Sequence, residues 1–345
     1  MSLTDLPLEV LFLLPSYLHD LEDFKNTASS CRALRDVCAK TLPSTILRLA
    51  DASTPVFFSP HPHFLVAASV RSVGDWALGS AERTKLLQEA FRGGIYSLYR
   101  FCLDHGGLTL DRIREMHLAR FTTINPVSDK IDKMAGTQWM QTPKFWEGGV
   151  SEANTVFTDA DRATLQIIIY GELFGRSMDA FLNPIENLPS FDITTRLGYL
   201  TYCLPDDEEP NKPDGPTQFS YYDDQWALRH ILLCGRWRRM WAAAIRAHID
   251  TGFVCENATP KEWRKEMLMD ALLLQGVKGL QLITCKPDEV SEEVLARARQ
   301  VRGQVLTLKE PPRTQVFGKQ KGTSVVSEAP DPRNEIRVVS REQWY

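Results

Sequence analysis

The feature that most constrains this 345-residue chain is a densely apolar stretch near its start, LTDLPLEVLFLLPSYLHDLEDF, residues 3–24. Its aliphatic residues recur at spacings of three and four, which is typical of one face of a helix. These residues are Leu6, Val10, Leu11, Leu14 and Leu18. Phe12 and Leu13 add apolar surface on other sides, so a small core cannot cover the whole stretch.

Three short helices are predicted in the first 50 residues. Pro15 lies late in the first of them, where the missing N–H should kink or end the helix. Asp20 or Asp23 is suited to cap the second helix, whose apolar face includes Phe24. Helices this short cannot build a large core of their own. Their surplus apolar face must be covered either by the rest of the chain or by another protein.

A secretory signal is not expected in this stretch. Its continuous apolar run, residues 10–14, is short, is preceded by no Lys or Arg, and follows the acidic Asp5 and Glu9. No segment elsewhere approaches the roughly 20 uninterrupted apolar residues that a spanning helix needs. We therefore expect the protein to be made and kept inside the cell, in the cytoplasm, the nucleus or both.

Composition argues against several classes of partner. The formal net charge is -4, so no overall cationic field attracts phosphate backbones or anionic lipid. We expect neither nucleic acid nor membrane as a partner. The 7 cysteines are scattered without a CxxC pair, which argues against a disulfide framework and a zinc ribbon. No cofactor and no metal are expected.

A series of short motifs follows in order between residues 5 and 49. They are Leu6-Pro7-x-Glu9-Val10, Leu14, Tyr17-Leu18, Asp20-x-x-Asp23-Phe24 and Cys31-Arg32-x-Leu34-Arg35. In this order and at these distances they resemble the F-box, in the form common among fungal F-box proteins. The resemblance implies a three-helix module that docks on a Skp-type adaptor. The adaptor would link it to a cullin scaffold in an SCF ubiquitin ligase.

The resemblance also implies roles for individual residues. The candidates for adaptor binding or for the core of the module are Leu6, Pro7, Val10, Leu11, Leu14 and Leu18, with Phe24 in the core. This fits helix-in-groove recognition, in which apolar residues at helical spacing fill a complementary groove. The remainder of such a chain captures a protein substrate, whose identity the sequence leaves open.

The rest of the chain is predicted to be α-rich. Good helix formers with apolar residues at spacings of three and four occupy the segments 81–103, 159–174, 222–249 and 260–274. Long alternating strand patterns are scarce. The predicted fold class is therefore mainly α, with an N-terminal three-helix F-box module at 1–50, an α-rich substrate-binding body at 51–305 and an extended or disordered tail at 306–345. Within the body, the proline-rich and acidic segment 205–216 is predicted to be an exposed loop.

Few motifs in the body carry chemistry. His61-Pro62-His63 places two imidazoles on a proline-flanked turn, but no third metal ligand is near in the sequence, which favours a loop between elements. The segment 236–241, RWRRMW, interleaves cations with aromatics, as nucleic-acid and acidic-peptide binders do. On a helix it equally fits a buried stripe with a solvated basic face. Phosphate-binding loops, nucleophile elbows and HExxH motifs are missing, so no enzyme activity is predicted.

Two functions from different classes follow. The first is an interaction protein without catalytic residues, the substrate-recognition subunit of an SCF-type E3 ubiquitin ligase. A variant of it binds the adaptor without ubiquitinating a target. The second is an α-rich enzyme of unidentified chemistry, whose first helices belong to its core. In the first case the apolar surface of Leu6, Val10, Leu14 and Leu18 is exposed on a module, and in the second it is buried by residues beyond 62.

Overall fold

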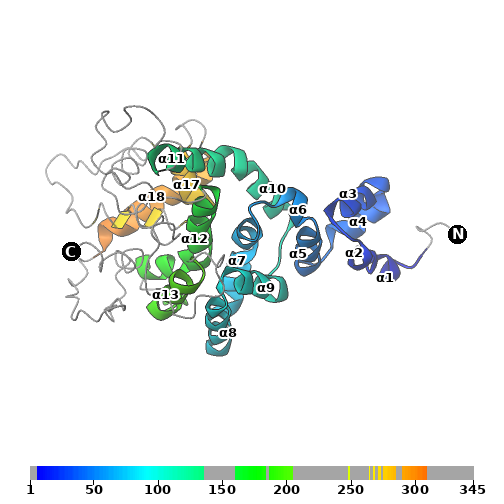
Figure 1. Ribbon diagram of the computed structural model, residues 1–345, viewed down its shortest axis with the longest axis horizontal. Coiled ribbons are helices and arrows are strands. Elements are labelled where there is room, and N and C mark those ends of the chain that lie inside the picture. The colour runs from blue at the N-terminus through cyan, green and yellow to red at the C-terminus, as the bar shows by residue number, and fades with distance from the viewer. Residues whose placement is uncertain are drawn as a thin grey trace. The chain divides into compact units, whose positions relative to one another are not determined.

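The computed structural model is mainly α, with no strand in the part of the chain that it describes (Figure 1). It describes residues 6–135, 160–183, 186–204, 275–284 and 290–308, together with positions 248, 264, 267–268 and 271–272. The predicted loop at 205–216, the RWRRMW motif at 236–241 and the tail beyond 308 lie outside these residues. None of the described helices has the length and apolar character needed to cross a membrane.

The chain forms two compact units, Met1–Leu118 and Ala119–Tyr345. The predicted module at 1–50 therefore lies in the same unit as the first part of the predicted body. Within this first unit, α5 (Pro43–Ala52) packs against α3 (Leu21–Ser30). It also packs against α7 (His63–Ala77) and α9 (Gly94–His105). The boundary predicted after residue 50 falls within this packing.

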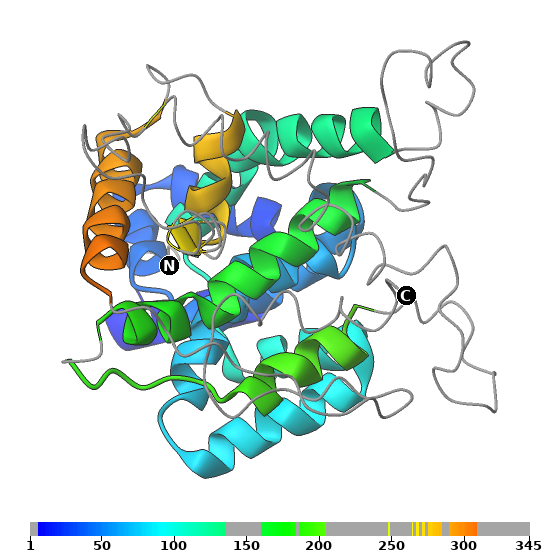
Figure 2. The same cartoon turned by 90° about the vertical axis from the view of Figure 1, so that its left-hand side faces the viewer.

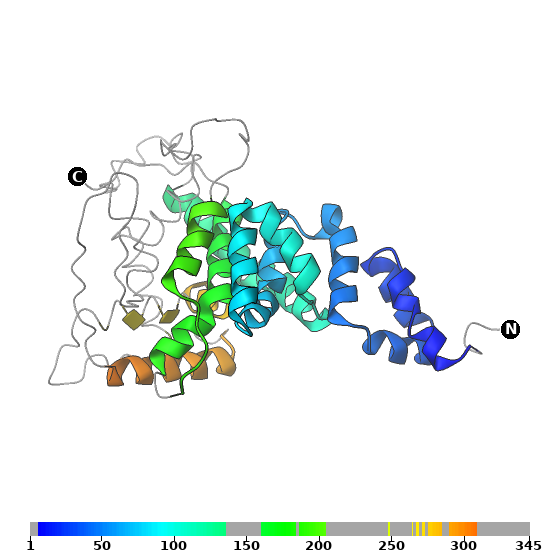
Figure 3. The same cartoon turned by 90° about the horizontal axis from the view of Figure 1, so that it is seen from below.

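Unit 1 is built from ten helices in its described part. They are α1 (Leu8–Leu11), α2 (Leu14–Tyr17), α3 (Leu21–Ser30), α4 (Arg32–Ala39), α5 (Pro43–Ala52), α6 (Thr54–Phe57), α7 (His63–Ala77), α8 (Ala81–Arg92), α9 (Gly94–His105) and α10 (Leu110–Ala119). The helices α3 and α4 pack on each other, and α7, α8 and α9 form a second group of neighbours (Figure 3). The helix predicted over 81–103 is thus two helices, because the chain turns at Gly94, whose φ is 75°.

The start of unit 1 differs from the predicted three-helix arrangement, which is not confirmed. Five helices, α1 to α5, occupy residues 8–52. Two single turns replace the one predicted first helix. The first, α1, ends at Leu11, and the second, α2, begins at Leu14, so Pro15 does not lie inside a continuous helix. Pro15 lies in the first turn of α2, where its missing N–H leaves no hydrogen bond unmade.

Of the two carboxylates predicted to cap the second helix, Asp20 and Asp23, the structure has Asp20 as the cap. The Oδ1 atom of Asp20 accepts a hydrogen bond from the backbone N–H of Asp23 at 2.8 Å, which satisfies one of the free donors at the start of α3. The helix then packs Phe24 into a cluster with Cys38 of α4 and Leu49 of α5. This cap therefore fixes where the chain turns from α2 into the core of unit 1.

Replacing the cap gives a testable stability change. Asp20→Ala should lower the free energy of unfolding by about 1 kcal/mol, because the Asp23 N–H loses its acceptor. Asp36→Ala is the matched control, since Asp36 is an exposed carboxylate within α4 and should change stability by less than about 0.5 kcal/mol. Urea unfolding of the two variants checks this, and equal effects of both would show that the cap does not stabilise α3.

Unit 2 is arranged around one long helix. Its described elements are the π-helix η2 (Arg120–Ile124), α11 (Asn125–Ala135), α12 (Ala160–Leu182), α13 (Ile193–Tyr202), α17 (Val277–Thr284) and α18 (Glu292–Thr307). Figure 2 shows α12 in green, α17 in golden yellow and α18 in orange, and all three pack on one another. The helix predicted over 159–174 thus continues to Leu182. Residues 264, 267–268 and 271–272, from the segment predicted helical over 260–274, are helical.

Candidate functional site

Four of the six predicted adaptor-binding residues pack inside unit 1. Leu11 is buried in a cluster with Leu34 and Val37 of α4, and Leu6 and Leu14 pack against the same cluster. Aliphatic side chains on these short turns thus close a small core against one face of α4. These three residues hold α1 and α2 in place.

The remaining three predicted residues divide between core and surface. Leu18 packs against the cluster that contains Phe24. Pro7 and Val10 are exposed, with 45% of the Val10 side chain open to solvent. Of the predicted set, these two are therefore available to a partner in this structure.

In addition to Val10, the structure exposes large apolar residues outside the predicted set of six, among them Phe12 and Leu13, which the sequence placed on other sides of the helix. Large apolar side chains exposed within residues 8–17 are Leu8 (57%), Val10 (45%), Phe12 (38%), Leu13 (55%) and Tyr17 (75%). We call these five residues the α1–α2 surface. A single exposed leucine is ordinary, but such a concentration in one short segment is typical of an interaction site.

The α1–α2 surface is fastened to the rest of unit 1 by Arg48 of α5. One guanidinium nitrogen of Arg48 donates to the backbone carbonyls of Pro15 at 3.3 Å, Ser16 at 3.0 Å and Leu18 at 3.3 Å. These carbonyls lie at the end of α2, where helical partners are missing and a cation is favoured. The apolar side chains are thus presented from a backbone that is tied to the core.

A second chemistry-bearing group in unit 1 fastens helices together. His61 and Pro62 lie in the turn before α7, as predicted, and the His61 ring meets the Tyr99 ring edge-on with centroids 4.7 Å apart. The Tyr99 hydroxyl donates to the Asp51 carboxylate, which joins α9 to α5. Burial lowers the pKa of His61, and Asp51 partly offsets this effect. Burial, followed by the hydrogen bond to Asp51, raises the pKa of Tyr99.

The described residues contain no group of three or more His, Cys, Asp or Glu side chains placed to hold a metal ion. His61, and His63 at the first position of α7, accordingly belong to no such group. We interpret these contacts of His61, Tyr99 and Asp51 as structural, because they join α5, α9 and the turn before α7.

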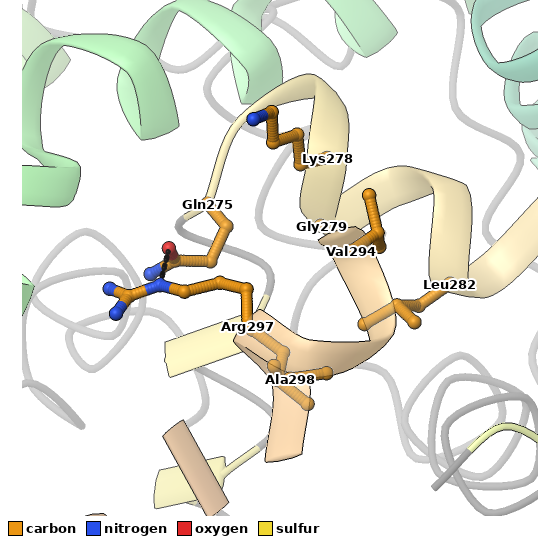
Figure 4. Close-up of a pocket in the computed structure, with 8 residues that line it drawn as sticks. Gln275, Lys278, Gly279, Leu282, Val294, Arg297 and Ala298 are labelled. Atoms are coloured by element: carbon orange, nitrogen blue, oxygen red, sulfur yellow. Dashed lines mark hydrogen bonds between the residues drawn. The ribbon is translucent and has the colours of Figure 1, made fainter. Parts of the chain in front are cut away.

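Unit 2 contains a small hollow that is lined by residues of α17 and α18 (Figure 4). Gln275, which lies just before α17, also lines it. Its charged side chains already have partners within the unit. Arg297 donates to the Gln275 side-chain oxygen at 3.1 Å and pairs with Asp179, while Lys278 pairs with Glu293. Since these cations are engaged, the hollow offers less to a ligand than the α1–α2 surface does.

Comparisons of the chain with protein-family models, with curated proteins and with solved structures found no match. The functional argument therefore rests on two properties of the same residues. The first is the motif order between residues 5 and 49, and the second is the exposed apolar surface at residues 8–17.

Proposed function

We propose that this protein is the substrate-recognition subunit of an SCF-type E3 ubiquitin ligase and binds a Skp-type adaptor through the α1–α2 surface. One observation carries the proposal. The exposed apolar side chains of Leu8, Val10, Leu13 and Tyr17 lie inside the residues whose motifs resemble the F-box. Short helices that present apolar side chains are suited to fill a groove on another protein.

The alternative, an enzyme with these helices in its core, requires a different environment for them. It predicts that residues beyond 62 bury the apolar surface. Leu6 and Leu14 are instead covered by the Leu11, Leu34 and Val37 cluster, and Val10 stays exposed. Leu110 packs on the cluster that Leu18 also contacts, which is the one such contact beyond residue 62 in the two described clusters. Of these four residues Val10 is exposed, as the receptor function requires, and Leu18 shares a cluster with a residue beyond 62, as the enzyme alternative requires. The proposal therefore rests on the exposed α1–α2 surface and not on these four residues.

The proposed role assigns no catalytic residue to this chain. In an SCF-type ligase the transfer of ubiquitin belongs to other subunits, and the receptor contributes two binding surfaces. The α1–α2 surface would supply the first, which reaches a cullin through the adaptor. The part of the chain beyond residue 50 would supply the second, for a protein substrate.

A calorimetric titration tests the proposal. Purified full-length protein titrated with a purified Skp-type adaptor should bind with one-to-one stoichiometry and a dissociation constant of about 1 μM or lower. Absence of binding by a protein with native helical circular dichroism would overturn the proposal. A cullin-dependent ubiquitination assay on the resulting complex separates a ligase receptor from a protein that binds the adaptor alone.

A further inference from the structure

A free cation lies beside the α1–α2 surface. Lys40 directly follows α4, and its backbone N–H donates to the carbonyl of Val37 at 3.1 Å, which fixes the start of its side chain. The Lys40 ammonium lies 5.6 Å from the centroid of the Phe12 ring. Phe12 is itself part of the α1–α2 surface, with 38% of its side chain exposed.

Among the described residues, no carboxylate pairs with this ammonium. No ion pair among the described residues includes Lys40, although Glu9 of α1 and Asp36 of α4 are exposed acidic residues in the same unit. The Phe12 ring is thus the group that holds the charge in place, and water solvates the remainder. Arg48 differs from Lys40, because one of its guanidinium nitrogens already donates to three backbone carbonyls at the end of α2.

A partner that covers Phe12 must remove water from the Lys40 ammonium. An unpaired charge that loses its water is costly, and an aromatic face replaces only part of the lost solvation. A carboxylate is the group that restores it, through a charge-assisted hydrogen bond. Electrostatic pairing at the rim of an interface acts chiefly on the association rate and on specificity.

We propose that Lys40 is a recognition residue of the α1–α2 surface and that the adaptor places a carboxylate beside Phe12 to pair with it. This inference rests on the proposed function and adds to it the chemistry of the partner. The adaptor surface then has an apolar centre for Leu8, Leu13 and Tyr17 and an acidic group at the edge that meets Lys40.

The test measures binding kinetics of purified full-length variants to the immobilised purified adaptor at low and moderate salt. Lys40→Glu should weaken binding by about 10-fold, mainly through slower association, because it places two carboxylates opposite each other. Lys40→Gln should weaken it by about 3-fold and reduce its dependence on salt. Lys25→Glu on α3 is the matched control, since it changes the net charge equally at another exposed lysine and should stay within about 2-fold of the wild type.

The outcomes separate this inference from the proposed function. If the wild type binds the adaptor and Lys40→Glu weakens binding no more than Lys25→Glu does, the Lys40 pairing is wrong and the adaptor function stands. If the wild type does not bind, both are overturned. Circular dichroism and thermal unfolding of each variant establish that a loss of binding does not come from a loss of fold.

Discussion

Replacing Leu8 and Leu13 together by serine should weaken adaptor binding by roughly 100-fold or more and leave the fold intact. The two residues are 57% and 55% exposed, so more than half of the area of each can still be buried by a partner. Burying a leucine in an interface contributes about 1.5 kcal/mol or more, and two such losses correspond to roughly a 100-fold change in affinity. Because both are surface positions, the free energy of unfolding should change by less than about 0.5 kcal/mol.

Two comparisons make this result specific. Leu86→Ser removes a leucine that is 44% exposed on α8, away from the α1–α2 surface, and should leave binding unchanged. Leu11→Ser removes a leucine that is 4% exposed in the cluster under α1 and should destabilise unit 1. Calorimetry and urea unfolding on the same preparations distinguish the three cases. Wild-type affinity in the Leu8 and Leu13 double variant would contradict the assignment of the surface.

Gly276→Ala should destabilise unit 2 by roughly 2–4 kcal/mol, through strain and through displacement of a buried carboxylate. Gly276 has a φ of +65°, and a Cβ atom there would lie 2.3 Å from Oε1 of Glu172. That oxygen accepts a hydrogen bond from the backbone N–H of Val277 at 3.3 Å, at the start of α17. Since Glu172 is buried on α12, moving its carboxylate breaks a link between α12 and α17.

Gly303→Ala is the matched control, with the opposite expected sign. Gly303 lies in α18, is exposed, and has no atom within 4 Å of the position that a Cβ would take. Alanine should therefore stabilise α18 by about 0.5–1 kcal/mol, through its better helix propensity. Hydrogen exchange of peptides from α12, α17 and α18 reports on unit 2 directly. Equal protection in the two variants would show that the Gly276 conformation is not required.

The sequence predicted well those features that local chemistry determines. Apolar spacing located the helices within 81–103 and 159–174. The cap of α3 was narrowed to Asp20 or Asp23, because capping depends on a side chain about three residues before its N–H donor. The division between α8 and α9 was missed although Gly93 and Gly94 are adjacent in the sequence. Two consecutive glycines inside a helical pattern were the signal that could have located it.

It was harder to predict which side chains of the first two helical turns are buried and which are exposed. A single helix from Leu6 to Leu18 places its stripe of leucines on one face, but the chain forms two turns, and the direction of each side chain changes between them. Leu8, Phe12, Leu13 and Tyr17 therefore became the exposed residues in addition to Val10. Pro15 was predicted to kink or end the first helix, but the apolar stripe was still assumed to continue through it to Leu18.

The extent of unit 1 also has no local signature. Its helices are joined by contacts between residues far apart in the sequence, such as the hydrogen bond from Tyr99 to Asp51 and that from Arg48 to Ser16. Neither contact follows from spacing or propensity, because both depend on how helices already formed meet one another. The boundary after residue 50 follows the extent of the F-box resemblance, which takes no account of such contacts.

The most direct test of the docking surface is an amide hydrogen-exchange footprint of the full-length protein with and without the purified Skp-type adaptor. The single-turn helices α1 and α2 should exchange rapidly in the free protein, because isolated turns are marginally stable. The adaptor should slow the exchange of residues 8–17, with smaller changes in unit 2. Binding that leaves residues 8–17 unchanged, or protection confined to residues beyond 119, would contradict the account.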